Sequence, residues 1–247
     1  MKRHGNWVIK LLLVLMAALW LSVVAASWSE AASPGEETDG EYNFSWLDPD
    51  KKVSVLQNRK FRKANRVLLS LNIGLADTNA YRTSYVLDPR LAYYFSEAWG
   101  IEVFYSTFSN KKNTTYRSLE STGASARPDV IEIKNQVGVL LHWVPWYAKI
   151  NVFNTVLYFD WYFTGGVGTM NADMIPGGAS QAQGIAQTTK SLTGYHLGTG
   201  HLFHLSDNFD VRLDFRNTWF KAPERAVTGK ETFFNSTTFQ IGVGFRL

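Results

Sequence analysis

Apolar and polar side chains alternate along most of the chain after its first quarter, and the last nine residues show this pattern most clearly. There, Phe239, Ile241, Val243, Phe245 and Leu247 alternate with Gln240, Gly242, Gly244 and Arg246. Because successive residues of a β-strand point to opposite sides of a sheet, this segment predicts a strand with one apolar face. The final strand of a soluble antiparallel sheet would show the same period, so the segment alone leaves both interpretations open.

From residue 66 onward, the alternation recurs in roughly eight segments of about ten residues, the length of a tilted transmembrane strand. A second clear example is 209–216, where apolar residues alternate with Asp210, Arg212, Asp214 and Arg216. Pro89 interrupts the segment 85–95 and predicts a bulge there. No helical period competes over a comparable length. The pattern therefore predicts an all-β domain.

Short and long connections alternate between these segments. The segments 96–98 and 206–208 are tight turns, whereas about 109–130, 169–191 and 221–232 are long and polar. Outer-membrane barrels have this asymmetry, with short periplasmic turns and longer extracellular loops. Two connections do not fit, because 77–80 is short on the long side and 143–154 is long on the short side. We predict an antiparallel transmembrane β-barrel of roughly eight strands in the bacterial outer membrane of a Gram-negative cell.

The amino terminus predicts export. Lys2, Arg3 and Lys10 precede and flank an apolar run that ends in small residues at 24–26, so residues 1–26 are interpreted as a signal peptide. An uncleaved anchor is the alternative. Residues 27–65 then form a flexible and basic periplasmic leader, and 66–247 form the barrel. The chain has no cysteine, which excludes disulfides and thiolate metal sites.

Charge argues against nucleic acid as a partner. The signal holds three of the 25 lysines and arginines and none of the 21 acidic residues, so the remaining chain is close to neutral. A basic cluster from Arg59 to Arg66 is predicted to face water, with phosphate headgroups as an alternative contact.

The polar faces of the predicted strands carry nearly all the charge. Lipid belongs outside such a barrel and charge inside it, which predicts a lumen network. Its members are Arg90, Glu102, Lys134, Asp160, Asp210, Arg212, Asp214, Arg216 and Arg246. Because a small barrel is filled by its own side chains and buried charges must pair, we predict a structural, salt-bridged lumen. A narrow gated pore is the alternative.

Aromatic residues near the predicted strand ends form a second group. Amphipathic rings favour the membrane interface, which predicts an aromatic girdle. Its members are Tyr85, Phe95, Trp99, Trp143, Trp146, Tyr195 and Trp219. The terminal strand, with Phe239, Ile241, Val243, Phe245 and Leu247 on one face, is predicted to close the barrel and to engage the barrel assembly machinery.

Catalysis finds little support in the sequence. His201, His204 and Ser206 lie close together, but the two histidines fall on opposite faces of their strand, and no acidic partner follows from the spacing. We predict no catalytic residue, metal or cofactor, with an outer-membrane lipid hydrolase as the alternative. The polar loops could bind a surface ligand or glycan. The barrel wall is expected to contact outer-membrane lipid or lipopolysaccharide. A soluble periplasmic barrel with an apolar lumen would require the opposite assignment of faces.

Two segments also resemble a known family. The stretch from Val53 to Phe61, followed by Lys63 and Arg66, and the stretch Pro145 to Gly168 are similar to the myxobacterial-type outer-membrane β-barrel domain family. The resemblance covers most of residues 51–247. It implies an outer-membrane barrel without assigned chemistry, so no catalytic residue carries over. Leu247 departs from the aromatic end that is common in outer-membrane proteins.

Overall fold

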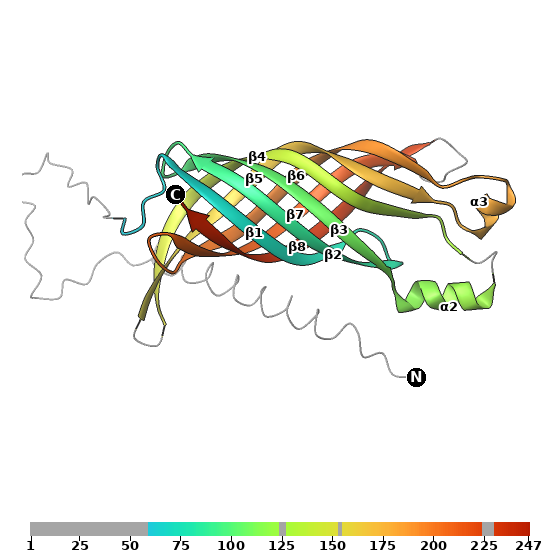
Figure 1. Ribbon diagram of the computed structural model, residues 1–247, viewed down its shortest axis with the longest axis horizontal. Helices are drawn as coiled ribbons and strands as arrows, with labels where there is room; N and C mark the ends of the chain where they lie inside the picture. Colours follow the sequence, from blue (N-terminus) through green and yellow to red (C-terminus); the bar gives the residue numbers. More distant parts are fainter. Residues whose placement is uncertain (1–58, 124–126, 153–154, 224–229) are drawn as a thin grey trace, which may run out of the picture. The chain divides into compact units, whose positions relative to one another are not determined.

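The computed structural model describes residues 59–123, 127–152, 155–223 and 230–247 (Figure 1). The chain divides into two units, residues 1–57 and 58–247, and all the described residues belong to the second. The predicted signal peptide and most of the predicted leader therefore lie outside the described residues. Neither helix among the described residues is long and apolar enough to cross a membrane.

Eight strands make up nearly all of the described chain. They are β1 (Arg66–Asp77), β2 (Arg82–Tyr94), β3 (Trp99–Lys112), β4 (Val130–Val152), β5 (Thr155–Ile175), β6 (Thr188–His204), β7 (Phe209–Pro223) and β8 (Glu231–Arg246). Two helices, α2 (Thr114–Thr122) and α3 (Gly178–Ala182), lie in the long connections. Each strand pairs antiparallel with its neighbours in sequence, and β8 pairs with β1 to close the barrel. The predicted fold is confirmed.

Strand β8 shows why this sequence closes into a barrel. Its residues pair with β1 on one side, as in Ile73 with Ile241, and with β7 on the other, as in Leu213 with Ile241. Val243 is 60% exposed on the outer face, whereas Gln240 is fully buried inside. The outer face thus offers apolar side chains to lipid, while the lumen takes the polar ones. This excludes the inverted arrangement with an apolar face turned inward along the whole barrel.

The bulge predicted at Pro89 is absent, because β2 keeps one register with β1 across this position. Pairing with β3 lapses after Leu87 and resumes at Arg90 in the same register. A proline removes an N–H donor without adding a residue, so the strand needs no bulge to accept it. The register shifts of the described β4–β5 pair lie elsewhere, between Ile133 and Asn135 and between Trp143 and Trp146.

The long connection predicted at 143–154 is also wrong. Strand β4 continues to Val152 and pairs with β5 from Thr155 onward, so most of this segment is a β-hairpin. Figure 1 shows the hairpin extending past the neighbouring turns at the end of the barrel that carries the carboxyl terminus. The connections at the opposite end are shorter than predicted, because β5 continues to Ile175 and β6 begins at Thr188. At these strand ends the backbone still pairs with the neighbouring strand, although the alternation of apolar residues that predicts a transmembrane strand has ended.

Candidate functional site

The lumen is the part of the barrel where most buried charge gathers. Inward positions of the strands, together with Lys63 before β1, place five cations and five carboxylates there. They are Lys63, Arg90, Arg212, Arg216 and Arg246, with Asp88, Glu102, Asp160, Asp210 and Asp214, and each is at most 2% exposed. We call these ten residues the lumen network. Equal numbers of the two charges suit a buried site, where an unpaired charge is very costly.

The middle of the lumen network is built around Glu102 on β3. One carboxylate oxygen accepts from Nη1 of Arg212 at 2.5 Å, and the other accepts from Nη1 of Arg90 at 3.2 Å. Nε2 of His142 lies 3.3 Å from the same carboxylate. Three strands besides β3 thus meet at one acidic side chain, which ties opposite walls of the barrel together.

Asp214 forms a second junction near Glu102. It accepts hydrogen bonds from Arg90 at 3.1 Å and from Arg212 at 3.2 Å. The hydroxyl of Tyr162 donates to Asp214 at 2.8 Å and accepts from Nε of Arg212 at 2.7 Å. Arg90 and Arg212 therefore each contact both Glu102 and Asp214, which links the two junctions.

Asp88 extends this chain of contacts away from the middle of the lumen. It accepts from Nη2 of Arg90 and from Nη2 of Arg216, both at 2.8 Å. Charge-assisted hydrogen bonds of this kind are stronger than neutral ones. Together the contacts join three carboxylates to three arginines without a break.

A second group of the same network lies at the end with short turns. The ring of His204 lies between two carboxylates, with Nε2 at 2.9 Å from Asp160 and Nδ1 at 2.6 Å from Asp210. Arg246 donates to Asp210 at 2.6 Å, and Nζ of Lys63 donates to Asp160 at 2.5 Å. These contacts therefore join β8, the last strand of the barrel, to the segment that precedes β1.

Residues 59–65 pack against this end of the barrel, so the prediction of a flexible, solvated leader is wrong for them. Phe61 is 6% exposed, with its ring 5.5 Å from that of Tyr158 and 5.3 Å from that of His204. Burial lowers the pKa of Lys63 from its ordinary value, and the nearby Asp160 carboxylate opposes that shift. The prediction failed because the basic composition of this segment indicates exposure to water. In the structure, Phe61 and Lys63, two residues apart, point into the lumen.

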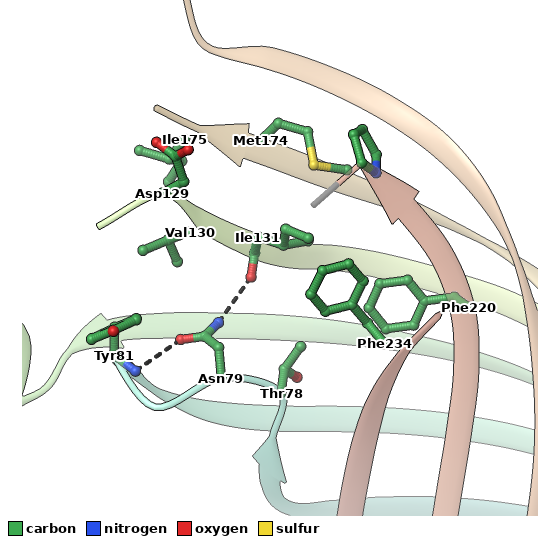
Figure 2. Close-up of a pocket in the computed structure, with 11 residues that line it drawn as sticks. Thr78, Asn79, Tyr81, Asp129, Val130, Ile131, Met174, Ile175, Phe220 and Phe234 are labelled. Atoms are coloured by element: carbon green, nitrogen blue, oxygen red, sulfur yellow. Dashed lines mark hydrogen bonds between the residues drawn. The ribbon is translucent and has the colours of Figure 1, made fainter. Parts of the chain in front are cut away.

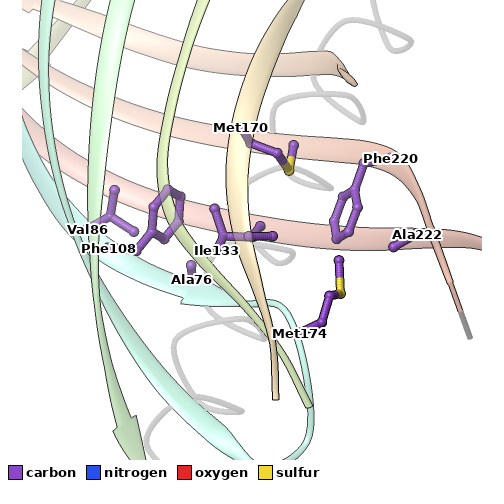
Figure 3. Packing of buried hydrophobic residues seen from close by; sticks show 9 residues of the cluster. Ala76, Val86, Phe108, Ile133, Met170, Met174, Phe220 and Ala222 are labelled. Carbon is purple, nitrogen blue, oxygen red and sulfur yellow. The ribbon is translucent and has the colours of Figure 1, made fainter. Parts of the chain in front are cut away.

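The opposite half of the lumen holds a group of buried apolar side chains (Figure 3). A cluster of buried side chains comes from the ends of β1, β3, β5 and β7 and from the starts of β2 and β4. Its members are Ala76, Val86, Phe108, Ile133, Met170, Ala172, Met174, Phe220 and Ala222, which we call the apolar cluster. Side chains thus occupy the described lumen along its length, with the charged network towards the short turns and the apolar cluster towards α2 and α3.

A family model described as outer membrane protein beta-barrel domain matches residues 15–246. The chain belongs to the outer membrane protein β-barrel domain family. Family membership and the closed ring of eight strands place the chain in the bacterial outer membrane.

Several solved structures of small barrels are similar to this family member. The N-terminal β-barrel domain of Pseudomonas aeruginosa OprF is 12% identical, covers 74% of this chain and 98% of its own, and gives a TM-score of 0.47. Neisserial surface protein A is 14% identical over 73% of this chain and 95% of its own, with a TM-score of 0.42. OprG from Pseudomonas aeruginosa is 14% identical over 77% and 99%, with a TM-score of 0.43. No curated protein matches the chain.

Of the residues predicted to line the lumen of this outer-membrane barrel, Lys134 is the exception. The other eight are buried in the network, but the side chain of Lys134 is 45% exposed. Its Nζ lies 3.4 Å from both Glu132 and Asp173 near the start of β4. The register shift between Ile133 and Asn135 reverses the parity of the strand there and turns Lys134 outward.

Four members of this site were not predicted from the sequence. Lys63 lies outside the strands, and Asp88 shares the inward parity of Arg90 on β2, which was the signal available for it. His142 and His204 are both buried, and each lies within 3.3 Å of a carboxylate of the network. The inward parity of His142 beside Leu141 and Trp143 was the signal available for it.

The predicted interface aromatics point outward from the barrel wall. Six of the seven are 40–55% exposed, and Trp219 is half-buried. Trp99 and Trp143 stack with ring centroids 6.2 Å apart, and Trp146 lies 4.9 Å from Trp161. These rings lie level with the start of β3, where Trp99 pairs with Trp143, and the β4–β5 hairpin continues beyond them. Their place at the membrane interface stays a prediction. Tyr195 instead lies well inside β6, because that strand begins earlier than the apolar period indicated.

The residues considered for a hydrolase do not converge. His204 points inward between Asp160 and Asp210, whereas the ring of His201 stacks on Trp161 of the outer wall, 5.7 Å between centroids. Ser206 accepts a hydrogen bond from the backbone N–H of Phe209 in an exposed turn. The histidine that could serve as a base is thus on the other side of the wall from the second histidine.

Helix α2 is held firmly to the rim of the barrel by its first residues. The side chain of Asn113 caps it, accepting from the backbone N–H of Tyr116 at 2.9 Å. The guanidinium of Arg82 lies 4.3 Å from the centre of the Tyr116 ring. Lys112 donates to Glu120 at 3.0 Å and thereby lowers the pKa of that exposed carboxyl. The helix presents Arg117 and Ser118 to solvent on a fixed support.

Proposed function

We propose that this outer-membrane barrel is a sealed, structural scaffold whose extracellular rim binds a partner at the cell surface. The observation that carries the proposal is the balanced lumen network beneath an apolar cluster. Opposite charges hold the walls together, and an ion would have to break several buried pairs to pass. A narrow gated pore is thereby disfavoured, since a conducting path needs sites that bind an ion weakly enough to release it.

Electrical recording tests the sealed lumen. The purified protein, reconstituted in planar bilayers with molar KCl, is expected to give no stepwise current. A porin reconstituted in the same bilayers serves as the positive control. The double variant Glu102→Ser with Arg212→Ser is expected to stay closed as well, because the apolar cluster still fills the other half of the lumen. Regular current steps from the wild-type protein would overturn the proposal in favour of a pore.

The rim is proposed as the binding surface because α2 and α3 lie in the longer connections, where barrels of this kind carry function. Arg117 is exposed on a helix that Asn113 and Tyr116 fix in place. We propose a glycan or protein partner, with lipopolysaccharide as the surrounding lipid and the barrel assembly machinery acting on β8. Without the predicted signal peptide the chain is close to neutral, which makes nucleic acid an unsuitable partner.

Surface exposure of the rim can be tested directly because the chain lacks cysteine. A membrane-impermeant maleimide is expected to label Ser118→Cys in intact cells but not Asp207→Cys in a turn at the opposite end. The reverse labelling would contradict the orientation. Binding is then tested with the protein in nanodiscs on a glycan array, where Arg117→Ala is expected to weaken selective binding. Equal binding by both proteins would place recognition elsewhere.

We further propose that the protein belongs to the myxobacterial type of barrel and that it is not an enzyme. The first proposal is supported by the segments Val53–Phe61 and Pro145–Gly168, of which the second forms the β4–β5 hairpin and the adjoining part of β5. The second is supported by the separation of His201 from His204 across the wall. Release of fatty acid from phospholipid by the purified protein, lost in His204→Asn, would establish a hydrolase instead.

A further inference from the structure

A cavity of about 180 Å³ opens at the end of the barrel that carries α2 and α3 (Figure 2). It lies where β1, β4, β5, β7 and β8 reach the rim. The residues around it are Thr78, Asn79, Tyr81, Asp129, Val130, Ile131, Met174, Ile175, Phe220, Pro223 and Phe234. We call it the rim pocket.

The walls of the rim pocket are mostly hydrocarbon, aromatic or thioether. Phe220 and Phe234 stack with their centroids 5.9 Å apart, and Figure 2 shows the two rings side by side below Met174. Met174 and Phe220 also belong to the apolar cluster, which closes the pocket from below. A molecule that enters therefore meets an apolar floor, and the lumen network lies beyond it. The pocket is a place to bind and not a way through.

Three polar residues around the pocket, Thr78, Asn79 and Asp129, use their side-chain atoms in hydrogen bonds within the protein. Nδ2 of Asn79 donates to the carbonyl of Ile131 at 2.9 Å, and its Oδ1 accepts from the N–H of Tyr81 at 3.0 Å. The hydroxyl of Thr78 bonds to that of Ser236 at 2.8 Å. Asp129 accepts from the backbone N–H of Gly177 and from the hydroxyl of Ser180. These groups build the rim and offer little to a polar ligand.

We propose that the rim pocket binds a small, uncharged, apolar molecule, such as a single aromatic ring or a short hydrocarbon chain. An apolar cavity of about 150 Å³ is large enough to hold benzene, so the volume here suits a ligand of that size or slightly larger. The lining includes the carboxylate Asp129 and no lysine or arginine among the described residues, which disfavours an anion. The inference goes beyond the rim binding of a macromolecule and does not depend on it.

Two methionines make the proposal measurable with toluene as the probe. Met174 lines the pocket, whereas Met170 lies in the apolar cluster without lining it. With ¹³C-methyl methionine in the full-length protein in nanodiscs, toluene is expected to shift the Met174 resonance in a saturable manner and to move that of Met170 much less. Met170→Leu and Met174→Leu assign the two signals. Equal, non-saturating shifts of both would mean simple partitioning and would overturn the proposal.

A pair of matched variants locates the site. Ile175→Trp fills the pocket from its edge and is expected to weaken toluene binding at least tenfold. Ile150→Trp makes the same replacement on an exposed position of β4 outside the pocket and is expected to leave binding unchanged. Heat-dependent electrophoretic mobility reports folding of both, and the milder Ile131→Phe replaces Ile175→Trp if that variant does not fold. Undiminished binding to a folded, filled variant would refute the assignment.

Discussion

The strongest consequence of the lumen network is that removing one charge from its centre should destabilise the barrel as a whole. Glu102 is fully buried and meets Arg90, Arg212 and His142. Glu102→Gln keeps the size of the side chain and some of its hydrogen bonds. It removes the negative charge between two guanidinium groups, so one positive charge of the lumen network is left unbalanced. Breaking a buried pair in this way costs about 3–5 kcal/mol.

The amide oxygen introduced by Glu102→Gln still accepts hydrogen bonds, so the lower end of that range, about 3 kcal/mol, is the expected loss. With a urea dependence of about 2 kcal/mol per molar, the unfolding midpoint should fall by about 1.5 M. The assay is urea unfolding of the protein folded into lipid vesicles, followed by tryptophan fluorescence and checked by heat-dependent mobility.

Two further variants separate charge from packing. Glu120→Gln neutralises an exposed acid that pairs with Lys112 on the rim, and its midpoint should match that of the wild type. Adding Arg212→Met to Glu102→Gln removes the surplus charge, so the double variant should lose less stability than the sum of the two single ones. A fall of less than about 0.5 M for Glu102→Gln would show that the lumen solvates its charges and would refute the reasoning.

Other positions allow shorter tests with the same unfolding assay. Lys134→Ala should change the midpoint by less than about 0.5 M, because Lys134 lies half in water at the rim; a loss equal to that of Glu102→Gln would place it in the lumen after all. Gly200→Ala should unfold more easily, since its new methyl group would lie 2.2 Å from the Tyr162 hydroxyl, whereas Gly165→Ala meets nothing closer than 3.4 Å and should be tolerated; equal midpoints would contradict this packing. Lys63→Met should destabilise the barrel by leaving Asp160 with one partner fewer, and trypsin should cut the segment 59–65 faster than in the wild type; unchanged cleavage would mean that the segment is not fixed by that pair.

The barrel could be predicted from the sequence because one physical rule determines the residue pattern of every membrane-spanning strand. Lipid accepts only apolar side chains and paired backbone, so the period of two in segments such as 209–216 fixes both the strand and the face that each residue occupies. Arg90, Arg212 and Arg246 could be placed in the lumen from parity alone. The rule stops where parity changes: at Ile133 an extra residue in β4 reverses it, and nothing in the local composition marks that bulge.

The segments outside the membrane escaped prediction for a different reason. There, strands extend because a partner strand is present and not because lipid demands alternation, so the hairpin of β4 and β5 could not be recognised from its own residues. The same applies to Lys63, whose position depends on Asp160, 97 residues later in the chain. Charge balance supplies the missing constraint. Without Lys63, the strands bring five buried carboxylates but four cations into the network, and a low-dielectric interior requires a further positive charge. A basic segment next to β1 is the nearest source, so neutrality of the lumen can serve as a criterion for deciding which flanking residues of such a barrel fold into it.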